Sequence, residues 1–366
     1  MPRSTANAFN LNALDLNAVN RAEEHRTLPP DLRASATRLT RLFAGYGTDA
    51  KQSLIQLATT AAPFVALLVV MACAVEKMYW LTLILSIPTA CFLVRLFILQ
   101  HDCGHGSFFK SRTANDLLGR ALSVLTLTPY SQWKLGHAIH HATTGNLDRR
   151  GRGDLDTLTV REYEALSWHR KLAYRLYRNP FFMVLLGAPI HFLLLQRLPI
   201  GFNFKDRTSR FSILSLNLAL VGAFGVAMLL LGVMPVLMIY LPVMIIASWI
   251  GNWLFYVQHQ FEDTYWEQDD NWNFHNAAVL SSSYFELPAI LRWFSGNIGL
   301  HHIHHLCSRI PNYRLQACLD ELPELRGMAR RITLRESLTC WKLALWDEER
   351  RLLVSFRDRK AAAAAA

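Results

Sequence analysis

Histidine is unevenly distributed along this chain, and its spacing is the strongest chemical signal in the sequence. Three short boxes read HDCGH (101–105), HAIHH (137–141) and HHIHH (301–305). In a helix, residues three and four positions apart lie on one face, so each box would present two or three converging imidazoles. Histidine is the commonest metal ligand in proteins. The spacing therefore predicts metal binding.

One further histidine follows the last long apolar run of the chain and raises the number of candidate ligands to nine. The nine are His101, His105, His137, His140, His141, His259, His301, His304 and His305. A tetrahedral ion takes four ligands, so nine donors fit two ions with four or five ligands each and leave positions open for a small reactant. Imidazole suits zinc, copper, iron and nickel alike, so the ligand type leaves the metal open.

The remaining histidines and the nearby acidic residues are expected to play other roles. His302 faces away from the stripe formed by its neighbours in the third box, so we expect it to support the ligands. Four isolated histidines are expected to be solvated or hydrogen-bonded: His25, His169, His191 and His275. A ligating imidazole usually donates its second N–H to a carboxylate or a carbonyl. The candidate carboxylates beside the boxes are Asp102, Asp148, Asp154, Asp156, Glu262 and Asp263.

Long apolar runs indicate where these histidines lie. The chain is 52% hydrophobic and 18% charged, and four runs approach the ~20 residues that a helix needs to cross a bilayer. The four runs are 57–75, 78–100, 211–232 and 234–256. Only a few residues separate the first two runs, and the last two nearly touch, which predicts two helical hairpins. We therefore expect an all-α polytopic membrane protein with four transmembrane helices and a cytosolic helical cap that holds a di-metal site.

Positive charge predicts the orientation of the chain. Lysine and arginine are frequent between residues 110 and 178 and nearly absent from the two hairpin tips. By the positive-inside rule the tips are external, and the cap and both chain ends are cytoplasmic. A fifth apolar run, 181–196, is shorter, so we expect it to be re-entrant or interfacial. The expected regions are an N-terminal cytosolic arm (1–50), a membrane domain (51–320) and a C-terminal cytosolic segment (321–366).

Other segments carry weaker signals. The first 50 residues lack the short apolar core of a signal peptide, so none is expected, and 31–43 is either a surface-binding segment or a solvated tail. The six cysteines show no paired spacing, and we expect reduced thiols. The run RRGRGD (149–154) would bind a lipid phosphate or an acidic redox partner, or it is an ordinary cytoplasmic loop of a membrane protein.

The three boxes, in this order and with hydrophobic hairpins before the first and the third, resemble those of the membrane fatty acid desaturase family. The resemblance runs from about Leu85 to Tyr313. HDCGHGSFF, the QH at 258–259 and HHIHHL followed by RIPNY are most similar to the omega-6 (Δ12-type) acyl desaturases, including their bacterial members. The resemblance implies two iron ions held by the nine candidate histidines. It also implies a four-span fold with a cytosolic cap.

The resemblance further implies the reaction and its partners. An O2-dependent oxidoreductase would remove hydrogen from two adjacent methylenes of a lipid-linked or thioester-linked fatty acyl chain and leave a cis double bond. Ferredoxin, or cytochrome b5 with its reductase, would deliver electrons as a separate protein, because the chain has no HPGG haem signature. We expect a multi-pass protein of the bacterial inner membrane with its active site on the cytoplasmic face, in contact with membrane lipid and without a nucleic-acid partner.

Two alternatives stay open at this level. Lipid hydroxylases, carotenoid ketolases or hydroxylases and alkane monooxygenases use the same boxes. A metal transporter would instead need ionisable ligands near the middle of the spans, whereas these histidines lie at the ends of the apolar runs.

Desaturation also requires a shaped apolar wall, since a misplacement of about 1 Å can reduce a rate about 100-fold. Candidate wall residues are Trp133, Trp253, Trp266 and Trp293.

Overall fold

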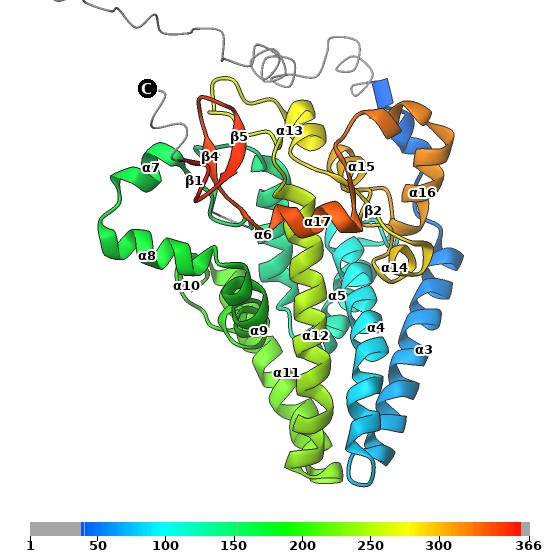
Figure 1. Ribbon diagram of the computed structural model, residues 1–366. Coiled ribbons are helices and arrows are strands. Elements are labelled where there is room, and N and C mark those ends of the chain that lie inside the picture. The colour runs from blue at the N-terminus through cyan, green and yellow to red at the C-terminus, as the bar shows by residue number, and fades with distance from the viewer. Residues whose placement is uncertain (1–37, 40, 152, 360–366) are drawn as a thin grey trace, which may run out of the picture.

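Four long helices form the lower part of the molecule in a computed structural model of the chain (Figure 1), which describes residues 38–39, 41–151 and 153–359. They are α3 (Ala50–Ala74), α4 (Tyr79–His105), α11 (Arg207–Leu231) and α12 (Val233–His259). Each is long and apolar enough to cross a membrane, by length and composition. The mostly helical fold and the four candidate spans confirm the predicted fold class.

The helices begin and end where the sequence supplies caps. The side chain of Asp49 accepts hydrogen bonds from the backbone of Lys51 and Gln52 at the start of α3, at 2.9 and 3.2 Å. Asp206 caps α11 in the same way. At the other end of α4, Gly106 adopts a left-handed conformation with φ of 68°, which favours glycine. Helix α4 therefore stops directly after His105, and the first box occupies its last turns.

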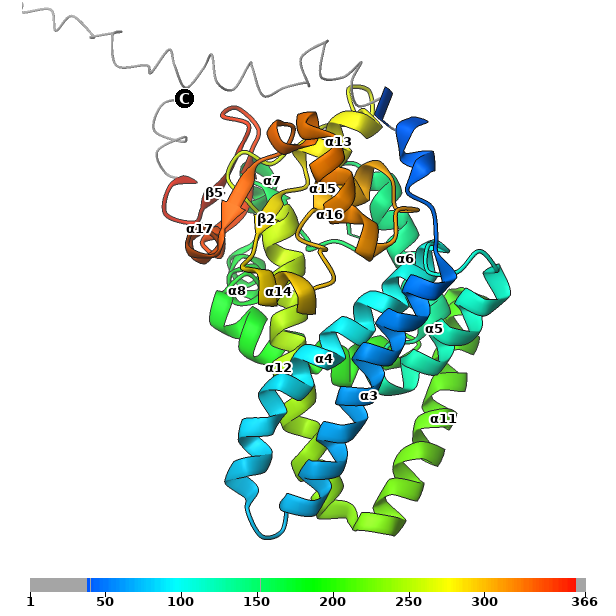
Figure 2. The same ribbon diagram turned by 90° about the vertical axis from the view of Figure 1, so that its right-hand side faces the viewer.

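The two hairpins pack side by side, with α4 against α12 at their centre. Both hairpin tips lie at one end of the molecule and the cap lies at the other (Figures 1 and 2). Leu96, Leu99 and Val257 are buried between the central helices. The outer helices α3 and α11 instead expose apolar side chains such as Val65 and Leu218, as expected of helices that face lipid.

The cap consists of short helices and two small sheets. Its helices are α5 (Arg112–Thr126), α6 (Tyr130–Thr143), α7 (Val160–Ala165), α13 (Phe274–Leu280), α14 (Ala289–Phe294), α15 (His301–Leu306), α16 (Asn312–Glu321) and α17 (Leu334–Cys340). The strands are β1 (Leu158–Thr159), β2 (Tyr284–Glu286), β3 (Arg331–Thr333), β4 (Leu343–Asp347) and β5 (Leu352–Ser355). The sequence did not predict these strands. They are short, and β1 with β4 and β2 with β3 pair across long separations, whereas β4 and β5 form a local hairpin.

One sheet fixes the position of the third histidine box. Strands β2 and β3 pair in parallel, with Phe285 opposite Ile332. The backbone N–H of Phe285 also donates to the carbonyl of Gly299 at 2.8 Å. A Cβ atom at Gly299 would collide with the carbonyl oxygen of Phe285, so only glycine permits this approach. Helix α15 begins two residues later and is thereby tied to the sheet.

The segment between the two hairpins is bent. It contains α8 (Trp168–Tyr177), a π-helix (Phe182–Gly187), α9 (Ala188–Leu193) and α10 (Phe202–Lys205). The helical pieces on either side of residue 180 meet at 70°, as in a broken span or a re-entrant loop. Four helices are candidate spans, or five if this bent pair is one span. The re-entrant or interfacial position expected for 181–196 stays a prediction.

Several sequence-based predictions concern residues outside the described ranges. His25, most of the N-terminal arm and most of the segment 31–43 lie there. Within the described ranges all six cysteines are free, as expected of reduced thiols.

Candidate metal centre

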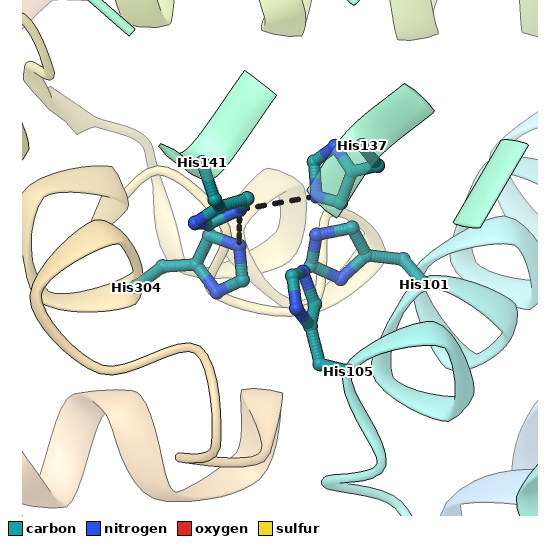
Figure 3. A group of neighbouring side chains, drawn as sticks. All are labelled: His101, His105, His137, His141 and His304. Atoms are coloured by element: carbon teal, nitrogen blue, oxygen red, sulfur yellow. Dashed lines mark hydrogen bonds between the residues drawn. The ribbon is translucent and has the colours of Figure 1, made fainter. Parts of the chain in front are cut away.

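The structure brings all nine candidate histidines together at the junction of the spans and the cap. Group one, drawn in Figure 3, contains His101, His105, His137, His141 and His304. Group two contains His140, His259, His301 and His305. In each group the potential ligand nitrogens all lie within 4.8 Å of one another. The groups draw on four helices, α4, α6, α12 and α15, and each could hold one metal ion.

The second and third boxes are divided between the two groups. His137 and His141 of α6 belong to group one, whereas His140 between them belongs to group two. In α15 the assignment is reversed, because His301 and His305 belong to group two and His304 to group one. The three histidines of such a box therefore do not all serve the same group. Each of these helices lies between the groups and serves both.

The spacing of the ring nitrogens fits metal coordination. The Nε2 atoms of His141 and His137 are 3.2 Å apart, and those of His304 and His141 are 3.0 Å apart. In group two the Nε2 atoms of His301 and His259 are 2.9 Å apart. Imidazole nitrogens bind metal at about 2.0–2.1 Å, which places neighbouring ligands of one ion about 3 Å apart. The side chains are thus arranged as ligands of a shared ion would be.

Hydrogen bonds on the outer ring nitrogens orient three of these imidazoles. The Nδ1 atom of His140 contacts Oδ1 of Asp154, Nδ1 of His259 donates to the carbonyl of Ser281 at 2.8 Å, and Nδ1 of His101 lies 3.3 Å from Oδ1 of Asp102. A proton held on Nδ1 leaves a lone pair on Nε2. The inward nitrogens are therefore available to a cation.

One inward nitrogen in each group has no other partner. The Nε2 atoms of His105 and His140 are buried and have no hydrogen-bond partner among the described residues. An unpaired buried polar atom is unfavourable by about 1–3 kcal/mol. Because Nδ1 of His140 faces a carboxylate, its Nε2 requires a donor or a cation. A metal ion satisfies this requirement, so the residues present fit the metal ions that the sequence implies.

The two groups differ in their access to solvent. All four histidines of group two are buried, whereas His105, His137 and His141 of group one are partly exposed. Burial, followed by the repulsion of neighbouring imidazoles, holds the pKa values of His304 and His305 well below the usual value for histidine. The rings are therefore neutral near pH 7, which is the form that coordinates metal.

The other histidines lie apart from both groups within the described residues. His302 is buried, its Nε2 donates to the carbonyl of Leu325 at 3.0 Å, and burial lowers its pKa to about 4. It thus anchors α15 to the segment that follows α16. His169 is exposed near Ser167, and His191 packs against Phe192. His275 at the start of α13 is also outside the two groups.

Two of the six candidate carboxylates contact these histidines. Asp102 and Asp154 do so as described, and Oδ2 of Asp102 also accepts hydrogen bonds from the backbone and the side-chain amide of Asn312, both at 2.8 Å. Asp148 instead accepts from the backbone of Asp269, and Asp263 lies near an arginine. Neither Asn312 nor the carbonyl of Ser281 was identified from the sequence. A backbone acceptor leaves no trace in the residue type, although Asn312 follows the third box within RIPNY.

The arginine-rich loop between α6 and β1 is occupied by contacts within the chain. Arg149 pairs with Asp269 at 2.9 Å, and Arg150 pairs with Glu162. Asp154, at the end of the same run, contacts His140. Arg152 of the same run lies outside the described residues, so the binding of a lipid phosphate or an acidic redox partner by this loop stays a prediction.

Of the four tryptophans considered as wall residues, Trp133 alone contacts the candidate ligands among the described residues. Its indole ring stacks on His137, with ring centres 4.6 Å apart. Trp253 stacks on Tyr256, and Trp293 lies under the guanidinium group of Arg95. A small cavity adjoins group two, and its wall includes His259, Asp154 and Trp266.

Comparison with known proteins agrees with this geometry. A family model described as fatty acid desaturase matches residues 78–334, which is more than half of the chain. The chain therefore belongs to the fatty acid desaturase family, and it is an oxidoreductase. A fatty acid desaturase of Bacillus subtilis is 46% identical to it over 88% of this chain and 91% of that protein.

Two cyanobacterial proteins of Synechocystis are similar at lower identity. One is named sn-1 acyl-lipid omega-3 desaturase (ferredoxin) and is 29% identical over 63% of this chain. The other is named sn-1 oleoyl-lipid 12-desaturase and is 27% identical over 64% of this chain. The alignments cover 64% and 66% of these proteins, slightly less than two thirds of their length. The family model and these relatives confirm the resemblance of the three histidine boxes to those of fatty acid desaturases.

Proposed function

We propose that the protein is an O2-dependent acyl-lipid desaturase in which group one and group two each hold one iron ion. The observation that carries this proposal is the meeting of nine imidazoles in two adjacent groups at the cap end of the spans. Two cyanobacterial relatives are named sn-1 acyl-lipid omega-3 desaturase (ferredoxin) and sn-1 oleoyl-lipid 12-desaturase, which favours a glycerolipid as the acyl carrier. The balanced reaction consumes one O2, two electrons and two protons, and it yields one double bond and two water molecules.

The iron ions would supply the redox chemistry, and the chain would hold and orient them. Asp154, Asp102 and the carbonyl of Ser281 keep protons on the outer nitrogens of His140, His101 and His259. The inward nitrogens of these rings would then be free to hold the iron ions. Burial of group two excludes bulk water from it, and a site protected from water limits side reactions of oxidants.

A separate donor would supply the electrons. One relative carries ferredoxin in its name, and we propose an iron–sulfur protein of this kind as the donor. Because three histidines of group one are partly exposed, we propose that electrons from the donor reach this group first. The excess of lysine and arginine on the cap side supports a cytoplasmic position of the centre, in a bacterial inner membrane.

Product analysis tests this function directly. We would express the chain in a bacterium that lacks polyunsaturated lipids and examine the glycerolipids and thioesters separately by mass spectrometry. The expected product is a lipid-linked acyl chain that has lost two hydrogen atoms. A gain of one oxygen atom would show a hydroxylase instead. A new double bond that is found first in the thioesters, and only later in the glycerolipids, would refute the lipid-linked substrate.

Metal analysis tests the centre independently of the product. The purified protein should contain about two iron ions per chain, given nine ligands at four to five per ion. Reduced iron content in variants of either group, with unchanged membrane insertion, is the expected result. Stoichiometric zinc in place of iron, in protein that is active as isolated, would contradict the proposed centre.

A further inference from the structure

Three aromatic side chains lie one helical turn from the histidine groups, and we call Phe97, Trp133 and Phe255 the aromatic floor. Each precedes a clustered histidine by four residues, namely His101, His137 and His259 respectively. Four residues are about one helical turn, so each ring lies on the histidine face of its helix. Because α4 and α12 run from the hairpin tips toward the cap, Phe97 and Phe255 lie on the membrane side of the histidines (Figure 1).

Ring contacts place Trp133 and Phe255 against the histidines, and Phe97 against Trp133. The ring of Phe97 lies 5.4 Å from that of Trp133, and Trp133 in turn lies 5.6 Å from His101. Under group two, the ring of Phe255 lies 5.5 Å from His140 and 5.4 Å from His259. Group one therefore has Trp133 and Phe97 beside it, and group two has Phe255.

The aromatic floor is not closed over by its neighbours. Phe97 is only partly buried, although the adjacent Leu96 and Ile98 on α4 are fully buried. Trp133 and Phe255 are also partly exposed. One turn below Phe255, a Cβ atom added to Gly251 would meet no atom within 4 Å. On α12, both Phe255 beside the histidines and Gly251 one turn nearer the membrane are thus only partly covered.

We propose that the acyl chain lies against the aromatic floor, and that the size of these rings selects which methylene pair reaches the metal centre. This inference rests on the proposed desaturase function and adds the residues that set the position of the double bond. They are positioning residues, because they act on the acyl chain by contact and take no part in electron or proton transfer.

The rigidity of the floor explains how it selects one position. A Cβ atom at Gly104 would lie 2.8 Å from the indole of Trp133, so the indole packs closely on Gly104 while it also stacks on His137. A displacement of the reacting carbon by about 1 Å reduces the rate about 100-fold. Truncating a floor ring lets the chain shift, and a neighbouring methylene pair then becomes reactive.

The test compares Phe97→Leu and Phe255→Leu with Phe92→Leu. Phe92 is a partly buried ring on the same helix as Phe97, but its ring contacts are with Trp293 and Phe294, whereas Phe97 contacts Trp133 of the aromatic floor. Double-bond positions in the lipids of the expression host would be determined by mass spectrometry of dimethyl disulfide adducts. We expect one positional isomer from the wild type and Phe92→Leu, and a second, shifted isomer from both floor variants.

Measured iron content separates loss of position from loss of the centre. Trp133→Phe keeps an aromatic ring against His137, so it should retain iron and still give a shifted isomer. Floor variants that retain iron and form the wild-type isomer alone, at any rate, would overturn the inference and leave the desaturase function intact. Absence of any unsaturated product from the wild type would instead overturn the proposed function.

Discussion

The contact between Asp154 and His140 permits a graded test of the metal centre. Asp154 contacts Nδ1 of His140 and thereby fixes the tautomer of this ring. The Nε2 atom of His140 has no hydrogen-bond partner among the described residues. Asparagine at this position keeps a carbonyl oxygen that accepts from Nδ1 but removes the negative charge, whereas alanine removes both. Loss of such an outer partner lowers metal affinity or activity 10–100-fold, or about 1.4–2.8 kcal/mol. We expect Asp154→Asn near the lower value and Asp154→Ala near the higher one.

Stability should change less than metal affinity. The second carboxylate oxygen of Asp154, Oδ2, is buried without a hydrogen-bond partner among the described residues. Asparagine replaces this oxygen with an amide nitrogen that also lacks a partner, so the cost of about 1–3 kcal/mol for an unpaired buried polar atom remains. The metal-free Asp154→Asn protein should therefore unfold at about the same temperature as the metal-free wild type. A defect caused by misfolding would lower that temperature.

The assay is competition for iron with a chelator of known affinity, followed by turnover under saturating donor. Asp148→Asn provides the matched control, because Asp148 lies in the same loop but is exposed and bonds to the backbone of Asp269. It should bind iron like the wild type. Wild-type iron affinity and turnover in Asp154→Ala would refute the assigned role of this carboxylate.

Three further results are expected. His304→Ala should lose iron from group one while the protein remains membrane-inserted, which metal analysis of washed membranes would reveal; full iron content would contradict the grouping. The metal-free protein should become less stable as the pH falls below about 6.5. Histidine in the unfolded chain titrates near that value, and the unfolded chain then binds protons that the folded chain does not. Burial lowers the pKa values of five histidines in the fold, namely His137, His141, His301, His304 and His305. Melting temperatures that are flat between pH 8 and pH 5.5 would oppose this. Gly119→Ala should destabilise the protein by about 1–3 kcal/mol through overpacking, because an added Cβ would collide with the ring of Tyr130. An added Cβ at Gly222 meets no atom within 4 Å, so Gly222→Ala should be neutral in the same denaturation assay.

The spans and the boxes could be predicted because each is a local property of the chain. A run of about 20 apolar residues is long enough to cross a bilayer whatever its neighbours are. The i, i+4 pairs, such as His101 and His105, share a helical face by the geometry of the helix alone. His259 required one further step, namely that the last span must end near the other boxes.

The small sheets, the contact of Asn312 with Asp102 and the aromatic floor could not be predicted in the same way. They depend on which segments meet across separations such as the 210 residues between Asp102 and Asn312. Phe97 and Phe255 did carry a signal, because each precedes a clustered histidine by one turn. That signal can be interpreted only once the structure shows that the rings of Phe97 and Phe255 are partly exposed.

Residue types and spacing alone predict nine imidazoles on helices that end at one side of a membrane. How two ions would share these imidazoles depends on the packing of the helices. Along a helix, positions i and i+4 differ by about 40° in direction, whereas i+3 and i+4 differ by about 100°. A helix between two ions therefore gives i and i+4 to one ion and i+3 to the other. Which ion receives the pair depends on how α6 and α15 pack against α4 and α12, and this packing reverses the assignment between the second and third boxes.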